Sequence, residues 1–61
     1  MMQLCDKVVI TNANDHEVAR YSHPEGLTIE HAFGEDRLYS GIGVLMGAWD
    51  VNEYRVSPVV K

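Results

Sequence analysis

One run without any charged side chain constrains the fold of this chain more than any other feature. It covers residues 38–49 and reads LYSGIGVLMGAW. In a strand, successive side chains alternate between the two faces, so Gly41, Gly43 and Gly47 would all lie on one face. A helix would have to contain three glycines, each costing about 1 kcal/mol relative to alanine. The run therefore predicts a strand.

The length of this run favours a bent strand. Strands usually contain about five or six residues, and a bend at a glycine would let a longer one serve two halves of a sheet, as in small barrels. A glycine also permits the close approach of an aromatic ring, which Trp49 would supply. The run is too short for a transmembrane helix, which needs about twenty apolar residues. Its glycine spacing also misses the dinucleotide-binding fingerprint.

Strand-like segments and turn signals alternate along the rest of the chain. The predicted strands are residues 4–11, 17–22, 27–33, 38–49 and 54–60, and the predicted turns are residues 12–15, 23–26, 34–37 and 50–53. Because Pro58 cannot donate a backbone hydrogen bond, the last strand is expected at a sheet edge. This pattern predicts an all-β fold in which a five-stranded meander closes into a small SH3-like or OB-like barrel. Residues 1–61 would form a single small domain.

Residues 28–39 leave a second architecture open. In a helix, Thr28 would cap the N-terminus, and Ile29 and Phe33 would face the core. Gly34 would stop such a helix after little more than one turn, so a strand is favoured. The alternative is an α+β domain in which residues 28–39 are helical.

The length and the single cysteine limit how the fold can be stabilised. A chain of 61 residues buries only about 60% of its unfolded surface. Cys5 is its one cysteine, so no internal disulfide can form, as suits a reducing compartment. Stability must come from packing, self-association or a partner. No basic segment followed by an apolar core opens the sequence, so no secretory signal is predicted and the cytoplasm is the expected location.

No catalytic, cofactor or metal site is predicted. The three histidines and Cys5 lack the short spacing of a structural zinc site. Cys5 or Ser22 would need a base within hydrogen-bond reach, and any short chain offers a combination such as Asp15 with His16 by chance. A domain of this size has little room for a closed pocket. We therefore expect a protein that is not an enzyme, and the sequence resembles no known family.

The charge of the chain indicates the kind of partner. Five basic and nine acidic side chains give a net charge of -4, which disfavours nucleic-acid binding and favours a partner with a basic surface. In a meander, alternate turns share an end of the sheet. This predicts two acidic groups, Asp15, Glu17, Glu35 and Asp36 at one end and Glu25, Asp50 and Glu53 at the other. Clustered carboxylates repel one another, a cost that binding would explain.

The aromatic residues flank the uncharged run and the last turn. Trp49 is expected to pack in the core over a glycine, and the alternative is an exposed aromatic platform for binding. If the platform is used, acidic groups supply charge and aromatic rings supply anchors. The residues predicted to contact a partner are Glu35, Asp36, Tyr39, Trp49, Asp50, Glu53 and Tyr54.

Together, these features favour a small acidic protein-interaction module. It would inhibit or modulate a larger protein with a basic surface, such as one that handles nucleic acid, by mimicking phosphate charge. Its size and composition are typical of phage- or mobile-element-encoded inhibitors. One alternative is a small-barrel nucleic-acid-binding protein that uses Arg20, Arg37, Arg55 and Lys61. Another is a structural subunit that forms a homo-oligomer through the Tyr54–Val60 edge strand.

Overall fold

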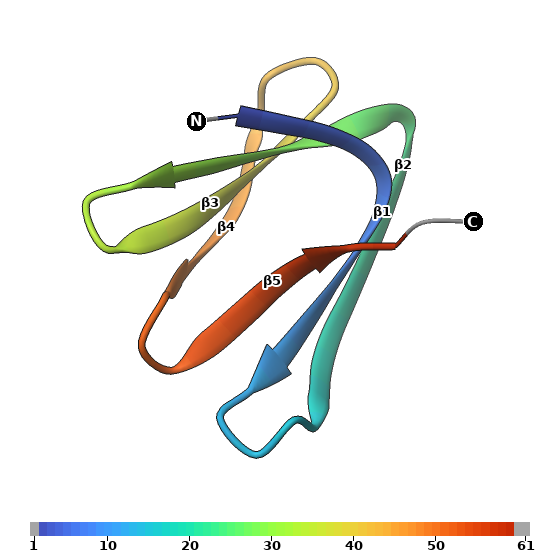
Figure 1. The fold of residues 1–61 in the computed structure, drawn as a ribbon. Helices are drawn as coiled ribbons and strands as arrows, with labels where there is room; N and C mark the ends of the chain where they lie inside the picture. The colour runs from blue at the N-terminus through green and yellow to red at the C-terminus, as the bar shows by residue number, and fades with distance from the viewer. Residues whose placement is uncertain (1, 60–61) are drawn as a thin grey trace.

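A computed structural model describes residues 2–59, which form five strands and no helix. The strands are β1 (Met2–Asn12), β2 (Glu17–Ala32), β3 (Glu35–Ser40), β4 (Leu45–Asp50) and β5 (Tyr54–Pro58). They form one antiparallel sheet in the order β4-β3-β2-β1-β5 (Figure 1). The predicted all-β fold with five strands is confirmed, and the alternative with a helix at residues 28–39 is wrong. Nothing in residues 2–59 forms a helix that is long and apolar enough to cross a membrane.

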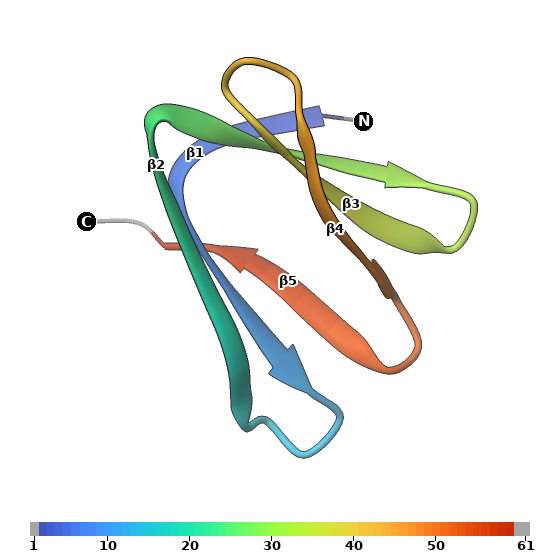
Figure 2. The same cartoon turned by 180° about the vertical axis from the view of Figure 1, so that it is seen from behind.

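β2 is a single bent strand where the sequence predicted two strands and a turn. Both of its halves pair with β1, through Tyr21 with Val8 and through Leu27 with Cys5. The ladder is interrupted between these pairs, where residues 23–26 form a local bend and do not reverse the chain. Figure 2 shows β1 and β2 curving together through this region. The predicted turn at residues 23–26 is therefore wrong as a chain reversal.

The uncharged run at residues 38–49 is two strands joined by a turn. Ser40 ends β3, and its N–H donates to the Val44 carbonyl at 2.9 Å, which closes the loop. Gly43 has a φ of 88°, a left-handed conformation that glycine adopts readily. The predicted continuous strand is wrong because its glycines permit a chain reversal. One strand was thus expected where two exist, and two were expected within β2, so the total of five is correct.

The turn between β2 and β3 is tighter than predicted. Phe33 and Gly34 are its two central residues, with φ values of 55° and 74°, and positive values at both positions define a type I′ turn. Residues 35–37, expected within a turn, belong to β3. The other two predicted turns are confirmed within a residue or two, because β1 ends at Asn12 and β4 ends at Asp50.

The sheet is open. Within residues 2–59, β4 pairs only with β3 and β5 pairs only with β1, so both are edge strands. They share the 51–53 turn and diverge from it in both views (Figures 1 and 2). The predicted edge position of the last strand is confirmed, with Pro58 as its final residue. Residue 60, which was predicted to belong to this strand, lies outside the described residues.

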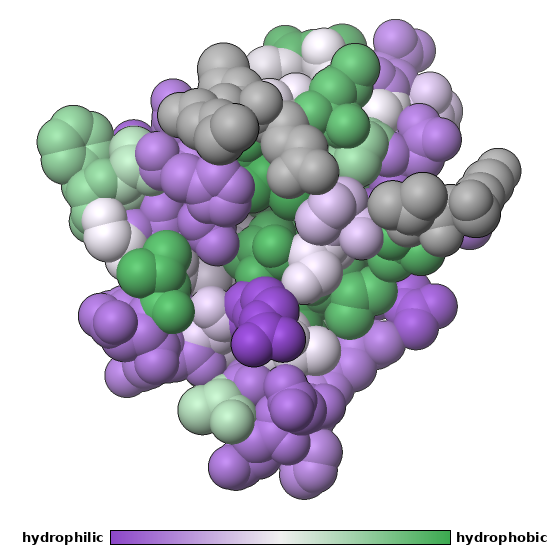
Figure 3. All heavy atoms as spheres, in the orientation of Figure 1, coloured by the Kyte–Doolittle hydropathy of each residue, from purple (hydrophilic) through white to green (hydrophobic). Residues whose placement is uncertain are grey.

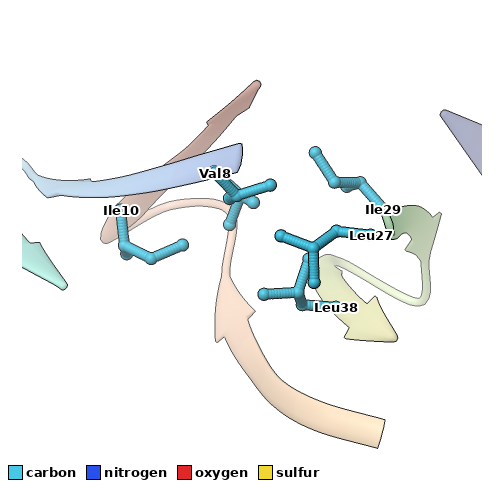
Figure 4. Close-up of a cluster of buried hydrophobic side chains, with 6 residues drawn as sticks. Val8, Ile10, Leu27, Ile29 and Leu38 are labelled. Atoms are coloured by element: carbon cyan, nitrogen blue, oxygen red, sulfur yellow. The ribbon is translucent and has the colours of Figure 1, made fainter. Parts of the chain in front are cut away.

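The core lies between the two halves of the bent sheet, beneath a surface of mixed polarity (Figure 3). Among the side chains whose burial the structure describes, residues 4–59, six apolar ones are buried: Val8, Ile10, Leu27, Ile29, Leu38 and Val56. Figure 4 shows Val8 from β1 and Leu27 and Leu38 from β2 and β3 pointing toward one another. Burial alternates along β3, so its inward and outward faces are well defined. Fully burying each such aliphatic side chain contributes about 1.5–3 kcal/mol.

Candidate functional site

The structure places three of the seven predicted contact residues against the interior. Asp36 is buried at 6% exposure, and its carboxylate is bonded to Nδ1 of His31 on the neighbouring strand. Trp49 and Tyr54 are partly buried and pack against the core. These three side chains make contacts within the fold. They would therefore support the binding surface from inside and would not contact a partner directly.

Trp49 joins the two halves of the bent sheet. Its ring packs edge-to-face on Tyr21 of β2, with the ring centroids 5.5 Å apart. It also covers Gly47, where an added Cβ would lie 2.6 Å from the indole ring. The expectation that Trp49 covers a glycine in the core is confirmed. Aromatic pairs of this kind are worth about 0.5–1.5 kcal/mol beyond the area that they bury.

Arg37 organises the outer face of β3. Its Nε donates to Glu35 Oε1 at 2.7 Å, and its Nη1 lies 3.9 Å from Glu30 Oε1. Tyr39 Oη donates to Glu30 Oε1 at 3.2 Å. The hydrogen bond to Glu35 raises the pKa of Arg37, and Tyr39 raises it further, so the guanidinium stays charged. Glu35 and Tyr39 thus lie at the surface, and the charge of Glu35 is offset by Arg37.

Three turns lie along one side of the molecule, with the 51–53 turn between the other two (Figures 1 and 2). We call this region the three-turn end and define it as residues 13–16, 33–34 and 51–53. Val51 N–H donates to the Gly34 carbonyl at 3.1 Å and joins the second turn to the third. A hollow of about 150 Å³ separates the first turn from the third. Its lining residues are Asn12, Ala13, Asp15, Val51, Asn52, Glu53, Tyr54 and Arg55.

This grouping corrects the predicted distribution of acids. Asp15 and Glu53 were expected at opposite ends of the sheet, but both line the same hollow. Glu25 lies elsewhere, beside Gly41, where an added Cβ would be 2.0 Å from the Glu25 carbonyl oxygen. The reason is that β2 bends at residues 23–26 and the chain reverses at residues 41–44 instead, so the alternation of turns expected of a flat meander does not hold.

The carboxylates of the three-turn end have few cationic partners. Asp15 Oδ1 is 4.0 Å from Arg55 Nη1, and both side chains are exposed. Asp50 accepts a hydrogen bond from the Asn52 N–H at 2.8 Å and lies directly opposite Glu35 in the β3–β4 ladder. Arg37 offsets the charge of Glu35, and among the described residues Asp50 has no cation within salt-bridge distance. The end therefore carries a negative charge that the fold itself only partly neutralises.

Phe33 is the feature of this end that the sequence analysis missed. Its side chain is 91% exposed, and its backbone has a φ of 55°. A non-glycine residue costs roughly 1–2 kcal/mol in this left-handed conformation. The Arg37 guanidinium lies 5.6 Å from the centroid of the Phe33 ring and forms a cation–π contact with it. Such a contact is worth about 0.5–1 kcal/mol at exposed sites, so it offsets part of the backbone strain. In Figure 3, apolar atoms project at the position of the β2–β3 turn.

A sequence signal for this residue exists. Two residues that end in glycine, between two alternating runs, are the usual mark of a tight hairpin. Phe33-Gly34 fits that mark, although phenylalanine replaces the usual Asn or Asp. The sequence analysis missed this hairpin signal because it assigned Phe33 to a strand over residues 27–33.

The cations proposed for nucleic-acid binding are mostly paired with acids. Arg20 Nη2 lies 2.7 Å from Glu17 Oε1, and this hydrogen bond lowers the pKa of Glu17. Arg37 is bonded to Glu35, and Arg55 lies near Asp15, as described above. Lys61 lies outside the described residues. No convergent basic surface is formed by the three described arginines.

Residues 2–59 contain no group of three or more His, Cys, Asp or Glu side chains that could hold a metal ion. Cys5 is partly buried, and its Sγ lies 3.7 Å from the Leu27 carbonyl. Burial raises the pKa of its thiol, and Asp6 raises it further, so the thiol is protonated at neutral pH. Comparison of the chain with protein-family models, curated proteins and solved structures produced no match.

Proposed function

We propose that this chain is a small acidic protein-interaction module that docks its three-turn end on a basic surface of a larger protein. Phe33 carries the proposal. A bulky side chain that is fully exposed in a strained backbone conformation does not stabilise the fold, because Asn or Gly would occupy this turn at lower cost. Aromatic side chains are enriched among the residues that dominate binding energy. Insertion of Phe33 into an apolar pocket of a partner would bury the exposed ring and explain why phenylalanine occupies this turn.

The surrounding charge supports a basic partner. Asp15 and Glu53 line the hollow beside Val51, which is itself 47% exposed. Complementary charge steers association and raises the rate of encounter more than it raises affinity. The acids would therefore orient the three-turn end, and Phe33 would supply most of the binding energy.

A protein that handles nucleic acid is the target class that we propose, because its basic surface is adapted to phosphate charge. Occupying that surface would inhibit or modulate the target, so we propose that the chain is a phage-like inhibitor. The protein would act in the cytoplasm, as its single unpaired cysteine suggests. We also propose a small-barrel arrangement, supported by the bent β2, both halves of which pair with β1.

Affinity capture with matched charge reversals tests the function. The immobilised chain is exposed to nuclease-treated bacterial lysate, and bound protein is eluted with a salt step. Glu53→Lys reverses a charge at the three-turn end, whereas Glu25→Lys makes the same change beside Gly41 at the bend. We expect one discrete protein to be retained by the wild type and Glu25→Lys, and to be lost with Phe33→Asn.

The rate of association with the captured protein separates the roles of charge and ring. Glu53→Lys should slow association and flatten its dependence on salt, while Glu25→Lys should do neither. Equal slowing by the two reversals, or capture that is indifferent to Phe33→Asn, would contradict docking through the three-turn end.

A further inference from the structure

β4 has one edge without a backbone partner. It pairs with β3 from Leu45 to Asp50, and no other strand in the part of the chain that the structure describes pairs with it. An unpaired strand edge presents N–H and C=O groups to any extended chain that approaches. The edge is therefore a possible template for an added strand.

Two hydrogen bonds establish which backbone groups face outward. Ser40 N–H donates to the Val44 carbonyl at one end of the β3–β4 pair, and Val51 N–H donates to the Gly34 carbonyl at the other. Residues alternate in direction along an antiparallel ladder. Counting back from Val51, Ala48 turns its N–H and C=O away from β3, toward the open side. The count from Val44 agrees once a β-bulge is included, because Leu38 pairs with Gly47 and Tyr39 with Leu45, which leaves Met46 as an extra residue in β4.

Two other open edges carry prolines or charged side chains, which β4 lacks from Leu45 to Trp49. β5 contains Pro58 and the charged Arg55, and the first half of β2 carries an exposed Glu17–Arg20 ion pair. Prolines and charged side chains are the usual devices that block pairing at an edge. β4 has neither from Leu45 to Trp49, and its first charge is Asp50.

The side chains along this edge have a polarity. Ile42, Val44 and Leu45 lie at its start and are 71%, 56% and 55% exposed. Its other end carries Asp50, and Glu53 follows in the next turn. A segment that pairs with this edge would therefore place apolar residues beside the apolar end and basic residues beside the acidic end. Since every pair in this sheet is antiparallel, the segment would begin beside the acids.

We infer that the β4 edge binds an extended segment of a partner protein as an added antiparallel strand. The segment has Lys or Arg in its N-terminal half, beside Asp50, and apolar residues in its C-terminal half, beside Leu45. This inference rests on the proposed function, because it assumes the same basic partner, and it adds a second contact beyond the three-turn end.

A second copy of this chain fits the edge less well. Two antiparallel β4 strands paired around Ala48 would place Asp50 of each copy beside Met46 of the other. Neither acid would meet a cation, and each would be brought to the apolar half of the edge. Charge complementarity therefore selects a basic partner segment over self-association.

Selection from a displayed library of random peptides, about ten residues long, tests the inference. The full chain serves as bait, and we expect enrichment of peptides with basic N-terminal and apolar C-terminal halves. Ala48→Pro removes the outward N–H and leaves the β3–β4 bonds intact. It should weaken binding of the enriched peptides by about tenfold or more. Peptide binding should also slow amide exchange at Ala48.

Two further variants guard against a folding defect in Ala48→Pro. Leu45→Thr reduces the apolar end of the edge without touching the backbone, and it should also weaken binding. Val18→Thr removes a similarly exposed apolar side chain on β2 and should not. The inference would be overturned if no peptide were enriched or if the enriched peptides had the reverse polarity. It would also be overturned if Ala48→Pro and Leu45→Thr both bound the enriched peptides as tightly as the wild type does.

Other outcomes separate the edge from the function on which it rests. If amide exchange at Ala48 slows with rising protein concentration and no peptide, a second copy occupies the edge and the inference is wrong. If the captured target still binds Ala48→Pro at full strength and is lost with Phe33→Asn, the edge is overturned and the three-turn end stands. If Phe33→Asn still captures the target and Ala48→Pro does not, docking through the three-turn end is overturned and binding at the β4 edge stands.

Discussion

Replacing Phe33 with asparagine should stabilise the protein and abolish binding at the same time. The ring is 91% exposed, so little burial is lost. Relief of the left-handed backbone strain is worth roughly 1–2 kcal/mol, since asparagine tolerates this conformation far better. Loss of the contact with Arg37 removes about 0.5–1 kcal/mol. The expected net gain is about 0.5–1 kcal/mol in the free energy of unfolding.

Urea denaturation followed by the fluorescence of Trp49 measures this gain. For a domain of this size, a gain of 0.5–1 kcal/mol corresponds to a rise in Tm of about 2–8 °C. Phe33→Ala is the control, because it keeps the strain and loses the ring, and it should lower stability by about 0.5–1 kcal/mol. If Phe33→Asn proved no more stable than Phe33→Ala, backbone strain at this turn would be refuted.

The remaining predictions concern packing and the thiol. Gly41→Ala should destabilise more than Gly47→Ala in denaturation experiments, because a Cβ at Gly41 would lie 2.0 Å from the backbone oxygen of Glu25. At Gly47 the obstacle is the Trp49 ring at 2.6 Å, which can tilt, so a loss of about 1–3 kcal/mol and a shift in fluorescence are expected. Cys5 should alkylate more slowly than a cysteine in a short peptide at mildly alkaline pH. Since folding raises the pKa of its thiol, its contribution to stability is present below the unfolded pKa and is lost as pH rises through the folded pKa.

The strand regions could be predicted from the sequence more reliably than the positions where the chain reverses. Alternation and β-branched residues at Val8 and Ile10 identify β1, and Pro58 places β5 at an edge. Proline and glycine at residues 23–26 mark a local change of direction. The same residues suit a reversal or a bend, and only pairing of both halves of β2 with β1 selects the bend.

The candidate site could be predicted less well because it depends on those reversals. Glu53 was expected in a turn and is exposed. Asp36 was also expected in a turn, but β3 begins at Glu35 and its side-chain alternation directs Asp36 inward. The meeting of the three turns follows from long-range topology, which no local pattern in the sequence encodes.

The strand order makes completion of the fold depend on β5. β2, β3 and β4 each pair with the strand made just before them, but β1 pairs on its other side with β5. Ile10 and Val56, which face each other in that pair, are 46 positions apart in the sequence. On the ribosome, β1 keeps an unpaired edge, and the core lacks Val56, until residues 54–58 emerge. A chain interrupted before β5 would therefore expose the features that chaperones and proteases recognise, so the stability of the described fold depends on β5.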